Sequence, residues 1–336
     1  MTYKIGSFNL KNLGLRSLAK TNKRDLSKIA QIIRDEQYDI VAFQEILSDG
    51  KAFNLNLLED SYSQNVKKTI LMELGINYDF SFAVAENETC PRNEGYGFLW
   101  NKNRIRLASA EVEEKERIFF PRMCKDVHAK GLIRRPFYGR FTPDRMPGGC
   151  FVEFRLICIH TFYGDNNAKD INERNKELEC LLKEVYPQIE DRVYQCNMPS
   201  YTVMLGDYNA ELWRPWKAVL NRKEPAYLEV DQNDIVIADK WDGKKIRTFQ
   251  DQFTTVRDLS KTDDNQNDLE ENTVNKFYVH DYDHFSFDID RFKDIGVKVS
   301  RVNAVEKYCN GDSQKYRESV SDHVPISLEI DLKSGG

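Results

Sequence analysis

The sequence has no long hydrophobic run and no excess of charge of one sign. None of its 336 residues lies in a stretch near the ~18 apolar residues that a membrane span needs, so we expect no membrane insertion. Its 49 Lys and Arg residues face 54 Asp and Glu residues, which gives a net charge of −5. This balance excludes a protein that holds a polyanion by bulk charge alone. A polyanionic partner would have to be held by a local patch or a metal ion.

Paired cysteines are also absent. The seven cysteines are an odd number and contain no CxxC pair, which excludes zinc-ribbon and thioredoxin-like proteins. Cys158 lies in an apolar run and is predicted to be a small buried hydrophobic residue. Residues 1–9 show no basic segment followed by an apolar one, so we expect no secretory signal and a reducing, cytoplasmic location.

Several short catalytic motifs are missing as well. The chain contains no GxxxxGK[ST] loop and no HExxH helix. It has no GxSxG turn of the kind that carries a nucleophilic serine. The pair Gly95 and Gly97 lacks the third glycine of a dinucleotide-binding loop. These absences disfavour nucleotide-binding loops, zinc proteases, serine hydrolases and nicotinamide enzymes.

The apolar pattern predicts an α/β fold. Apolar residues make up 40% of the chain and charged residues 31%, a globular composition. Strands and helices alternate without a repeat, and no composition shift marks a linker. We therefore expect residues 1–336 to form one domain of two packed sheets covered by helices. The predicted helices are 26–33, 55–74 and 171–186, and the predicted strands are 3–8, 39–43, 78–85, 96–100, 105–112, 132–141, 151–160, 201–205, 285–289 and 326–332.

Two segments stand out by their charge. Residues 258–272 carry six acidic residues against one lysine and are predicted to form a mobile acidic surface loop. Residues 117–145 carry eight Lys and Arg residues against two Asp. This basic stretch is either a solvated face or a surface that contacts substrate phosphates.

Polar residues recur where apolar strands begin or end, which is where catalytic groups are commonly placed. Singly, each is most often a helix cap, a surface group or a satisfied core histidine. Together they offer carboxylate and amide oxygens, which suit Mg²⁺, Mn²⁺ or Ca²⁺, and two imidazoles, which suit proton transfer. The set predicts metal-assisted hydrolysis of a phosphate ester. Its members are Asn9, Glu45, Glu94, His160, Asp207, Asn209, Asp283, Asp322 and His323.

The order of the motifs around these residues resembles the endonuclease/exonuclease/phosphatase superfamily, which has the deoxyribonuclease I-like fold. The resemblance runs from residue 3 to about residue 332. It implies a four-layer α/β sandwich, in which two mixed β-sheets pack face to face beneath outer helices. The motifs are Ser7-Phe-Asn9, Gln44-Glu45, Glu94-Gly-Tyr-Gly-Phe-Leu-Trp100, Ile159-His160-Thr161, Gly206-Asp-Tyr-Asn209, Tyr282-Asp-His-Phe285 and Ser321-Asp-His-Val-Pro325.

The resemblance also implies roles for the residues. Glu45 would be the principal Mg²⁺ ligand with Asn9 beside it, and Asp322 would be a second carboxylate on the metal side. Asp207 would orient or deprotonate the attacking water, and Asn209 would hold the phosphate or the metal. His323, oriented by Asp283, would stabilise charge on the phosphoryl group or move a proton. His160, paired with Glu94, would act on the opposite side of the phosphate, and Arg134 or Arg135 would bind the phosphate.

The wording of the motifs favours DNA as the substrate. The chain lacks the Pro-x-Trp-x-Asp-Arg motif that is usual in inositol polyphosphate 5-phosphatases. Residues 206–210, with Thr254-Thr255-Val256 upstream of Asp283, are similar to deoxyribonuclease I-type nucleases, so we expect a DNA endonuclease. Tyr208, Trp213 and Trp216 would stack on bases or pack in the core. The alternatives are a phosphatase, an inositol-phosphate or phospholipid phosphoesterase with the same site, RNA as substrate, and a catalytically silent interaction module.

Overall fold

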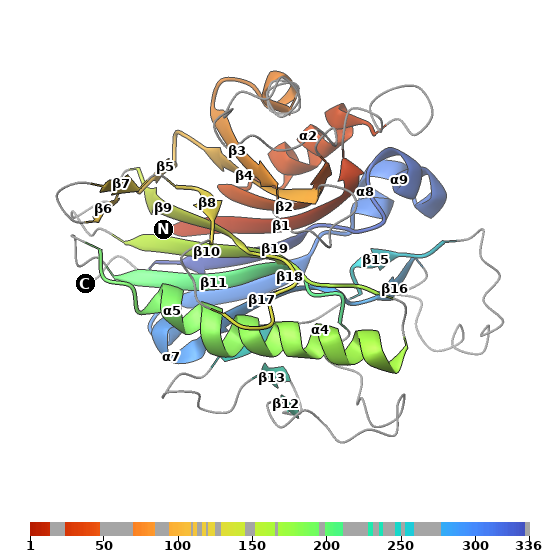
Figure 1. Cartoon of the computed structure of the whole chain (residues 1–336). Coiled ribbons are helices and arrows are strands. Elements are labelled where there is room, and N and C mark those ends of the chain that lie inside the picture. The colour runs from red at the N-terminus through yellow and green to blue at the C-terminus, as the bar shows by residue number, and fades with distance from the viewer. Residues whose placement is uncertain are drawn as a thin grey trace.

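The structure is a computed structural model of the whole chain (Figure 1). Two mixed β-sheets lie face to face, and helices cover their outer faces. None of the helices in the described part of the chain has the length and apolar character needed to cross a membrane. The residues described are 1–13, 24–47, 70–84, 94–108, 110–112, 116–118, 120–124, 129–144, 152–164, 167–194, 199–210, 228–230, 235–237, 246–249, 253–258 and 277–332.

The first sheet has six strands in the order β18-β19-β1-β2-β4-β3. Its two central strands, β1 and β2, run parallel, and every other neighbouring pair is antiparallel. The strands are β1 (Thr2–Leu13), β2 (Ile40–Leu47), β3 (Tyr78–Val84), β4 (Glu94–Asn101), β18 (Gly296–Arg301) and β19 (Ile326–Asp331).

The second sheet has nine strands in the order β12-β13-β14-β17-β11-β10-β9-β5, with β8 paired to β9. Here β10 and β11 are the parallel pair. The strands are β5 (Ile105–Leu107), β8 (Arg122–Met123), β9 (Phe137–Pro143), β10 (Glu153–His160), β11 (Ser200–Asp207), β12 (Leu228–Val230), β13 (Ile235–Ile237), β14 (Ile246–Phe249) and β17 (Asp283–Asp288). Two small antiparallel ribbons lie beside the sheets: β6 (Ala110–Val112) with β7 (Glu116–Ile118), and β15 (Thr255–Val256) with β16 (Tyr278–His280).

An apolar layer fills the space between the sheets. Ile5, Ile40 and Phe98 of the first sheet pack in one cluster with Leu156 and Val203 of the second, and all five are buried. Interdigitation of apolar side chains from the two inner faces holds the sheets at a fixed distance. The central layer therefore sets how closely polar groups at the ends of the strands can meet across the two sheets.

Helices close the two outer faces. On the first sheet, α2 (Leu26–Asp35), α8 (Ala304–Cys309) and α9 (Ser313–Ser319) bury apolar residues against β1 and β2. On the second sheet, α4 (Ala168–Cys180), the π-helical segment η2 (Leu181–Val185) and α5 (Tyr186–Glu190) do the same against β10 and β11. The short α7 (Ile289–Phe292) follows β17. The predicted four layers are confirmed.

Most predicted elements are confirmed, with shifted ends. Residues 105–112 are not one strand, because β5 joins the second sheet whereas β6 pairs with β7. Residues 132–136 are not strand either, and β9 begins at Phe137, directly after Pro136, which lacks the N–H group that a strand ladder needs. Of the predicted helix 55–74, residues 70–74 are helical and the rest lie outside the described residues. The acidic segment lies outside them from residue 259 to its end at 272.

Gly206 allows β11 to lie close against β10 just before Asp207. Its φ is +147°, and a Cβ atom there would lie 2.0 Å from the carbonyl oxygen of Ile159, its register partner. A side chain would therefore push the two parallel strands apart. The pairing of His160 with Asp207, one residue further along, depends on this close approach.

Gly206→Ala should lower the free energy of unfolding by ~3 kcal/mol or more, since it adds a backbone clash to an unfavourable φ. Gly75→Ala is a matched control, because Gly75 also has a positive φ, +86°, but has nothing within 4 Å of a Cβ. Gly75→Ala should lower the free energy of unfolding by only ~1–2 kcal/mol. Urea unfolding of both variants measures the difference, and equal losses would show that the strand contact at Gly206 is unimportant.

Candidate active site

The parallel pairs of both sheets end at the same edge. Asn9 pairs with Gln44 near the end of β1 and β2, and His160 pairs with Asp207 at the end of β10 and β11. Asp207 also pairs with Asp283 at the start of β17, so three polar residues lie in a row across the second sheet. The segment before β19 is held against this edge, where the Ser321 hydroxyl donates to the Asn9 carbonyl at 2.7 Å.

The Asn9 side chain joins the two sheets. Its amide nitrogen donates to Glu45 Oε1 at 2.9 Å and to Asp207 Oδ2 at 2.8 Å. Its amide oxygen accepts from the Lys11 backbone N–H at 2.9 Å, which fixes the orientation of the amide. Asn9 and Asp207 are almost completely buried. One amide thus holds a carboxylate from each sheet at the same point.

Glu45 lies on an irregular part of β2. Its φ is +56°, and the register of β2 against β4 shifts between Phe43 and Ile46. A bulge of this kind redirects a side chain, and a non-glycine residue with positive φ stores strain that functional sites commonly contain. The Asn12 backbone N–H donates to Glu45 Oε2 at 3.0 Å, and burial raises the pKa of Glu45 despite the nearby His160.

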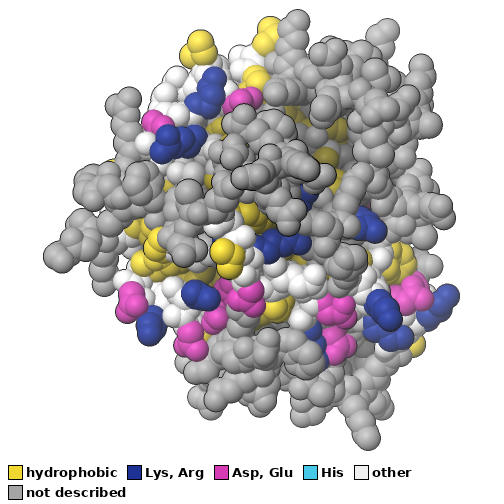
Figure 2. Space-filling view, turned by 60° about the vertical axis from the view of Figure 1, so that its left-hand side comes forward, with side chains coloured by type: hydrophobic (Ala, Val, Ile, Leu, Met, Phe, Trp, Pro, Cys, Tyr) yellow, Lys and Arg dark blue, Asp and Glu magenta, His cyan; other side chains and the backbone are white. Residues whose placement is uncertain are grey.

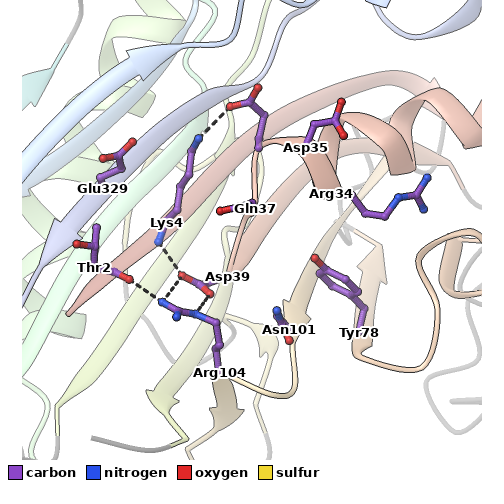
Figure 3. A pocket seen from close by; sticks show the side chains of 11 residues that line it. Thr2, Lys4, Arg34, Asp35, Gln37, Asp39, Tyr78, Asn101, Arg104 and Glu329 are labelled. Atoms are coloured by element: carbon purple, nitrogen blue, oxygen red, sulfur yellow. Dashed lines mark hydrogen bonds and ion pairs between the residues drawn. The ribbon is translucent and has the colours of Figure 1, made fainter. Parts of the chain in front are cut away.

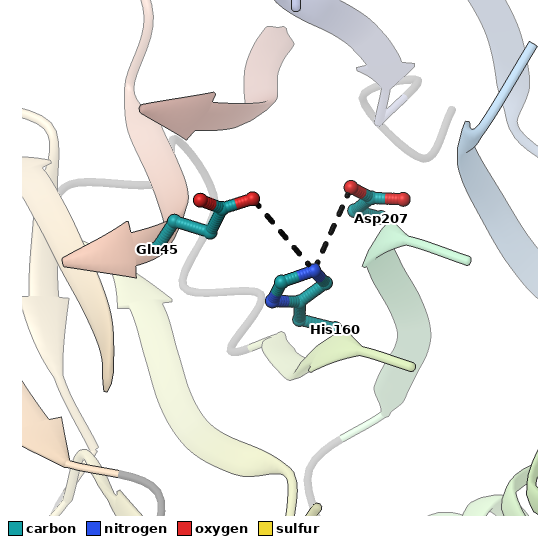
Figure 4. Close-up of side chains that lie close together, drawn as sticks. All are labelled: Glu45, His160 and Asp207. Atoms are coloured by element: carbon teal, nitrogen blue, oxygen red, sulfur yellow. Dashed lines mark ion pairs between the residues drawn. The ribbon is translucent and has the colours of Figure 1, made fainter. Parts of the chain in front are cut away.

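Figure 4 shows how Glu45, His160 and Asp207 point toward one another. His160 Nε2 lies 3.9 Å from Glu45 Oε1 and 3.8 Å from Asp207 Oδ2. One ligand atom from each of the three lies within 4.8 Å of the others, and the same holds for Asp207, Asp283 and His323. Asp207 belongs to both groups and is therefore the centre of the cluster.

His323 is held between two carboxylates. Its Nδ1 lies 2.7 Å from Asp283 Oδ2, and its Nε2 lies 3.6 Å from Asp207 Oδ2. Burial acts to lower the pKa of His323, but the charges of Asp283 and Asp207 outweigh it and raise the pKa to about 10. In the arrangement described, His323 is an imidazolium that can face an anion as a donor.

Arg134 enters the site beside His160. Its Nη1 lies 2.7 Å from His160 Nδ1, and its Nη2 lies 3.2 Å from Glu94 Oε2. A guanidinium can only donate, so Nδ1 accepts and the ring proton lies on Nε2, toward Glu45 and Asp207. Glu94 Oε2 is 3.4 Å from Nδ1, so the predicted pairing of Glu94 with His160 is shared with Arg134.

Two other arginines of the basic stretch, Arg135 and Arg140, point elsewhere. Arg135 turns away from the site, and its Nη1 donates to the Cys124 carbonyl at 3.3 Å. Arg140 is buried against Glu153 and the ring of Tyr194. Of the two arginines that the sequence offered for phosphate binding, the structure brings Arg134 to the site. The described part of residues 117–145 does not form one basic face.

Asp322 lies at the rim. Its Oδ2 is 2.7 Å from Lys11 Nζ and 3.8 Å from Arg317 Nη2. Burial acts to raise the pKa of Asp322, but the charges of His323 and Lys11 outweigh it and the pKa lies below its ordinary value. Among the described residues, Asp322 is in neither group of close ligand atoms. Its predicted place on the metal side stays a prediction.

Asn209 and Tyr208 make hydrogen bonds that hold the chain together at this edge. The Asn209 side-chain nitrogen donates to the Thr161 carbonyl, and its backbone N–H donates to Asp207 Oδ1, each at 2.8 Å. Its predicted contact with phosphate or metal stays a prediction. Tyr208 is fully buried, and its hydroxyl lies 2.8 Å from Ser286 Oγ, so it packs in the core and does not stack on bases. Trp213 and Trp216 lie outside the described residues.

The donor set fits a hard divalent cation. Glu45 and Asp207 bring two carboxylates to a single amide, and a divalent cation beside them would offset the repulsion between these like charges. Asp283 Oδ1 is buried and has no hydrogen-bond partner. Carboxylate oxygens without thiolates are the ligands that Mg²⁺, Mn²⁺ and Ca²⁺ prefer.

A separate cavity of about 640 Å³ lies at the opposite end of β1 and β2 (Figure 3). Two pairs of its charged residues contact each other: Lys4 Nζ lies 2.9 Å from Glu36 Oε2, and Arg104 contacts Asp39. Lys4 and Asn9 are five residues apart on one strand, which places the cavity ~17 Å from the cluster. We therefore assign the candidate site to the edge that carries Asn9.

Two residues at this edge were not identified from the sequence. Lys11 lies near the end of β1, beyond the predicted strand 3–8, and gave no signal of its own. Glu177 lies on the buried face of α4, in helical spacing with Ile171, Arg174 and Leu178. The helical spacing of the sequence places this carboxylate on the buried face of the helix, and a buried carboxylate is rare enough to have marked Glu177 as a candidate.

Comparisons with known proteins support the fold. No protein-family model and no curated protein matches the sequence. Solved structures do match: an endonuclease/exonuclease/phosphatase from Bacteroides vulgatus is 13% identical with a TM-score of 0.52, and covers 99% of this chain and 100% of its own. A family member from Leptotrichia buccalis C-1013-b is 18% identical with a TM-score of 0.50, and covers 98% and 100%. A mannosyl-6-phosphatase from Bacteroides thetaiotaomicron VPI-5482 is 14% identical with a TM-score of 0.48, and covers 98% and 100%.

Two mixed sheets packed face to face, with helices outside and polar residues at one edge, define an α/β sandwich of the deoxyribonuclease I-like class. The chain has the fold of the endonuclease/exonuclease/phosphatase superfamily over nearly its whole length. The resemblance found in the sequence motifs is thus confirmed for the fold.

Asp283→Asn should lower the pKa of His323 well below about 10. The substitution removes the carboxylate whose charge does most to offset the lowering of this pKa by burial. A raised pKa adds stability that is complete below the ordinary pKa of 6.5 and is lost as the pH rises toward 10. The fall in unfolding free energy over this window should therefore shrink in the variant. NMR titration of the His323 ring and urea unfolding, both without divalent ions, measure the two effects. An unchanged ring titration would contradict the assignment.

Proposed function

We propose that the protein is a metal-dependent phosphodiesterase and that its substrate is nucleic acid, with DNA favoured over RNA. One observation supports the proposal above all. Two carboxylates and two histidine rings meet beside Asn9 at the edge where the sheets end. Glu45, His160 and Asp207 come from separate strands, and His323 comes from the segment before β19. Solved structures with this fold carry the name endonuclease/exonuclease/phosphatase.

The residues of the chain divide the chemistry between them. Asp207, 3.6 Å from His323 Nε2, accepts the proton of the attacking water or orients that water. His323, held by Asp283, donates to a non-bridging phosphate oxygen and stabilises the charge that develops there. His160 offers an Nε2–H from the other side, and Arg134 fixes that tautomer and supplies a cation near the phosphate.

Glu45 would be the principal ligand of the divalent ion, and Asn9 fixes its carboxylate beside that of Asp207. When bound, such an ion neutralises developing charge on the phosphoryl and leaving oxygens. Mg²⁺ suits this role best because it binds through one or two carboxylates and completes its shell with water and phosphate oxygens. Mn²⁺ or Ca²⁺ would use the same ligands.

The mixed charge of the described surface favours contact with substrate phosphates at the site and not over a broad basic face. In Figure 2, most Lys and Arg side chains on the described surface stand near Asp and Glu side chains, and no broad basic face is seen. Tyr163, three residues after His160, is 46% exposed, and its ring lies 6.3 Å from that of Tyr282. An exposed ring at this place can stack on a base without reading its identity, so we expect little sequence specificity.

Asp207→Ala and His323→Ala should each reduce the rate of phosphodiester cleavage ~10²–10⁴-fold while the protein stays folded, since both act on the reacting groups. Nicking of supercoiled plasmid with Mg²⁺, and with EDTA as the control, measures the activity. Glu179→Gln, an exposed position on α4, is the control variant.

Assays with other phosphate esters separate the alternatives. Release of inorganic phosphate from inositol phosphates or sugar phosphates, without nicking, would replace the proposal with a phosphatase. Cleavage of a phospholipid would replace it with a lipid phosphodiesterase. Absence of every activity from folded wild-type protein would favour an interaction module.

Glu45→Gln should raise the Mg²⁺ concentration for half-maximal activity by at least ~10-fold, because an amide is a weaker ligand than a carboxylate. Asp322→Asn should shift it much less, since Lys11 lies 2.7 Å from that carboxylate. Metal titrations of cleavage compare the two variants. Equal shifts would make Asp322 a metal ligand, as the sequence predicted.

A further inference from the structure

Glu177 is a fully buried carboxylate on α4 that touches no group of the proposed chemistry directly. Its two oxygens accept hydrogen bonds from three backbone N–H groups. Oε1 accepts from Ile133 at 2.9 Å and from Arg134 at 2.8 Å, and Oε2 accepts from Phe162 at 2.8 Å. A buried carboxylate with three amide donors is satisfied without a cation, and each amide gains a charge-assisted hydrogen bond.

These three amides belong to the two segments that carry the His160 side of the site. Ile133 and Arg134 lie in the irregular residues before β9, and Phe162 lies in the irregular segment that follows His160 at the end of β10. Neither segment has a strand ladder at these positions to fix its backbone. Burial raises the pKa of Glu177, and the three backbone amides and Arg134 oppose this effect.

The network continues from Phe162 to the catalytic carboxylate. The Thr161 hydroxyl, next to Phe162, donates to the Tyr208 carbonyl at 2.5 Å. The Thr161 carbonyl accepts from the Asn209 side-chain nitrogen at 2.8 Å. Asn209 in turn donates its backbone N–H to Asp207. On its other side, Glu177 holds the backbone of Arg134, whose side chain contacts His160 and Glu94.

We propose that Glu177 is a positioning residue, which fixes Arg134 and the segment after His160 relative to each other by holding both backbones on α4. Its effect on cleavage rests on the proposed function, whereas its effect on the backbone does not. A displacement of ~1 Å in a reacting group can cost ~10²-fold in rate, so a tether of three hydrogen bonds matters even though it lies behind the site.

Glu177→Ala tests the proposal by two independent measurements. Hydrogen exchange followed by mass spectrometry should show at least ~10-fold faster exchange in peptides that cover residues 131–135 and 160–164. Exchange in β1 and β2, which α4 does not cover, should stay unchanged. Cleavage should fall ~10–100-fold in kcat. Glu177→Gln keeps one acceptor oxygen and should give intermediate values in both measurements.

Two controls separate positioning from stability. Glu153 is as buried as Glu177 and lies at the opposite end of β10, where it pairs with Arg140 and Arg155. Glu153→Gln should lower stability without the local exchange pattern and without a loss of kcat at temperatures where it is folded. Glu179→Gln, on the exposed side of α4, should change neither measurement.

Each result decides the proposal. Local exchange at both segments with a fall in kcat, graded from Gln to Ala, supports it. Exchange that rises over the whole chain, exchange that is unchanged, or a kcat equal to wild type would overturn it, and Glu177→Gln decides if the alanine variant does not fold. If wild-type protein cleaves no phosphodiester, the proposed function fails, and the exchange pattern alone decides the role of Glu177.

Discussion

The amide of Asn9 is the contact on which the candidate site depends. It is fully buried, and it binds Glu45 from the first sheet and Asp207 from the second, at 2.9 and 2.8 Å. The apolar layer beneath it fixes the separation of the sheets, so both carboxylates are brought to one point before any ligand arrives. Two carboxylates held this close together make this edge a candidate site for a divalent cation.

The backbone at this edge is irregular where the chemistry needs it. Lys11, Asn12, Glu45 and Asn209 all have positive φ, and Gly206 has φ +147°. Regular strands would alternate side chains between the two faces and could not bring these groups together at a sheet edge. The packed layers on either side hold the backbone in these conformations.

Sequence reasoning predicted the architecture well because apolar periodicity reports directly on which faces are buried. It failed at residues 105–112 and 132–136, where β-prone side chains continue but the pairing partner changes or a proline interrupts the ladder. For the site, the motifs predicted which residue types meet, and Asn9, Glu45, His160 and Asp207 do so. They could not distinguish Arg134 from Arg135, because adjacent residues of one type differ only in where the backbone directs them.

The sequence by itself determined the class of fold and the kinds of ligand atom available, since both follow from local pattern and side-chain chemistry. Only the tertiary structure decided that the Asn9 amide nitrogen faces the carboxylates of Glu45 and Asp207. It also decided that Asp322 forms an ion pair with Lys11 and that Tyr208 is in the core. These outcomes depend on contacts between residues up to several hundred positions apart. Such contacts are set by packing of the whole chain, which no local pattern encodes.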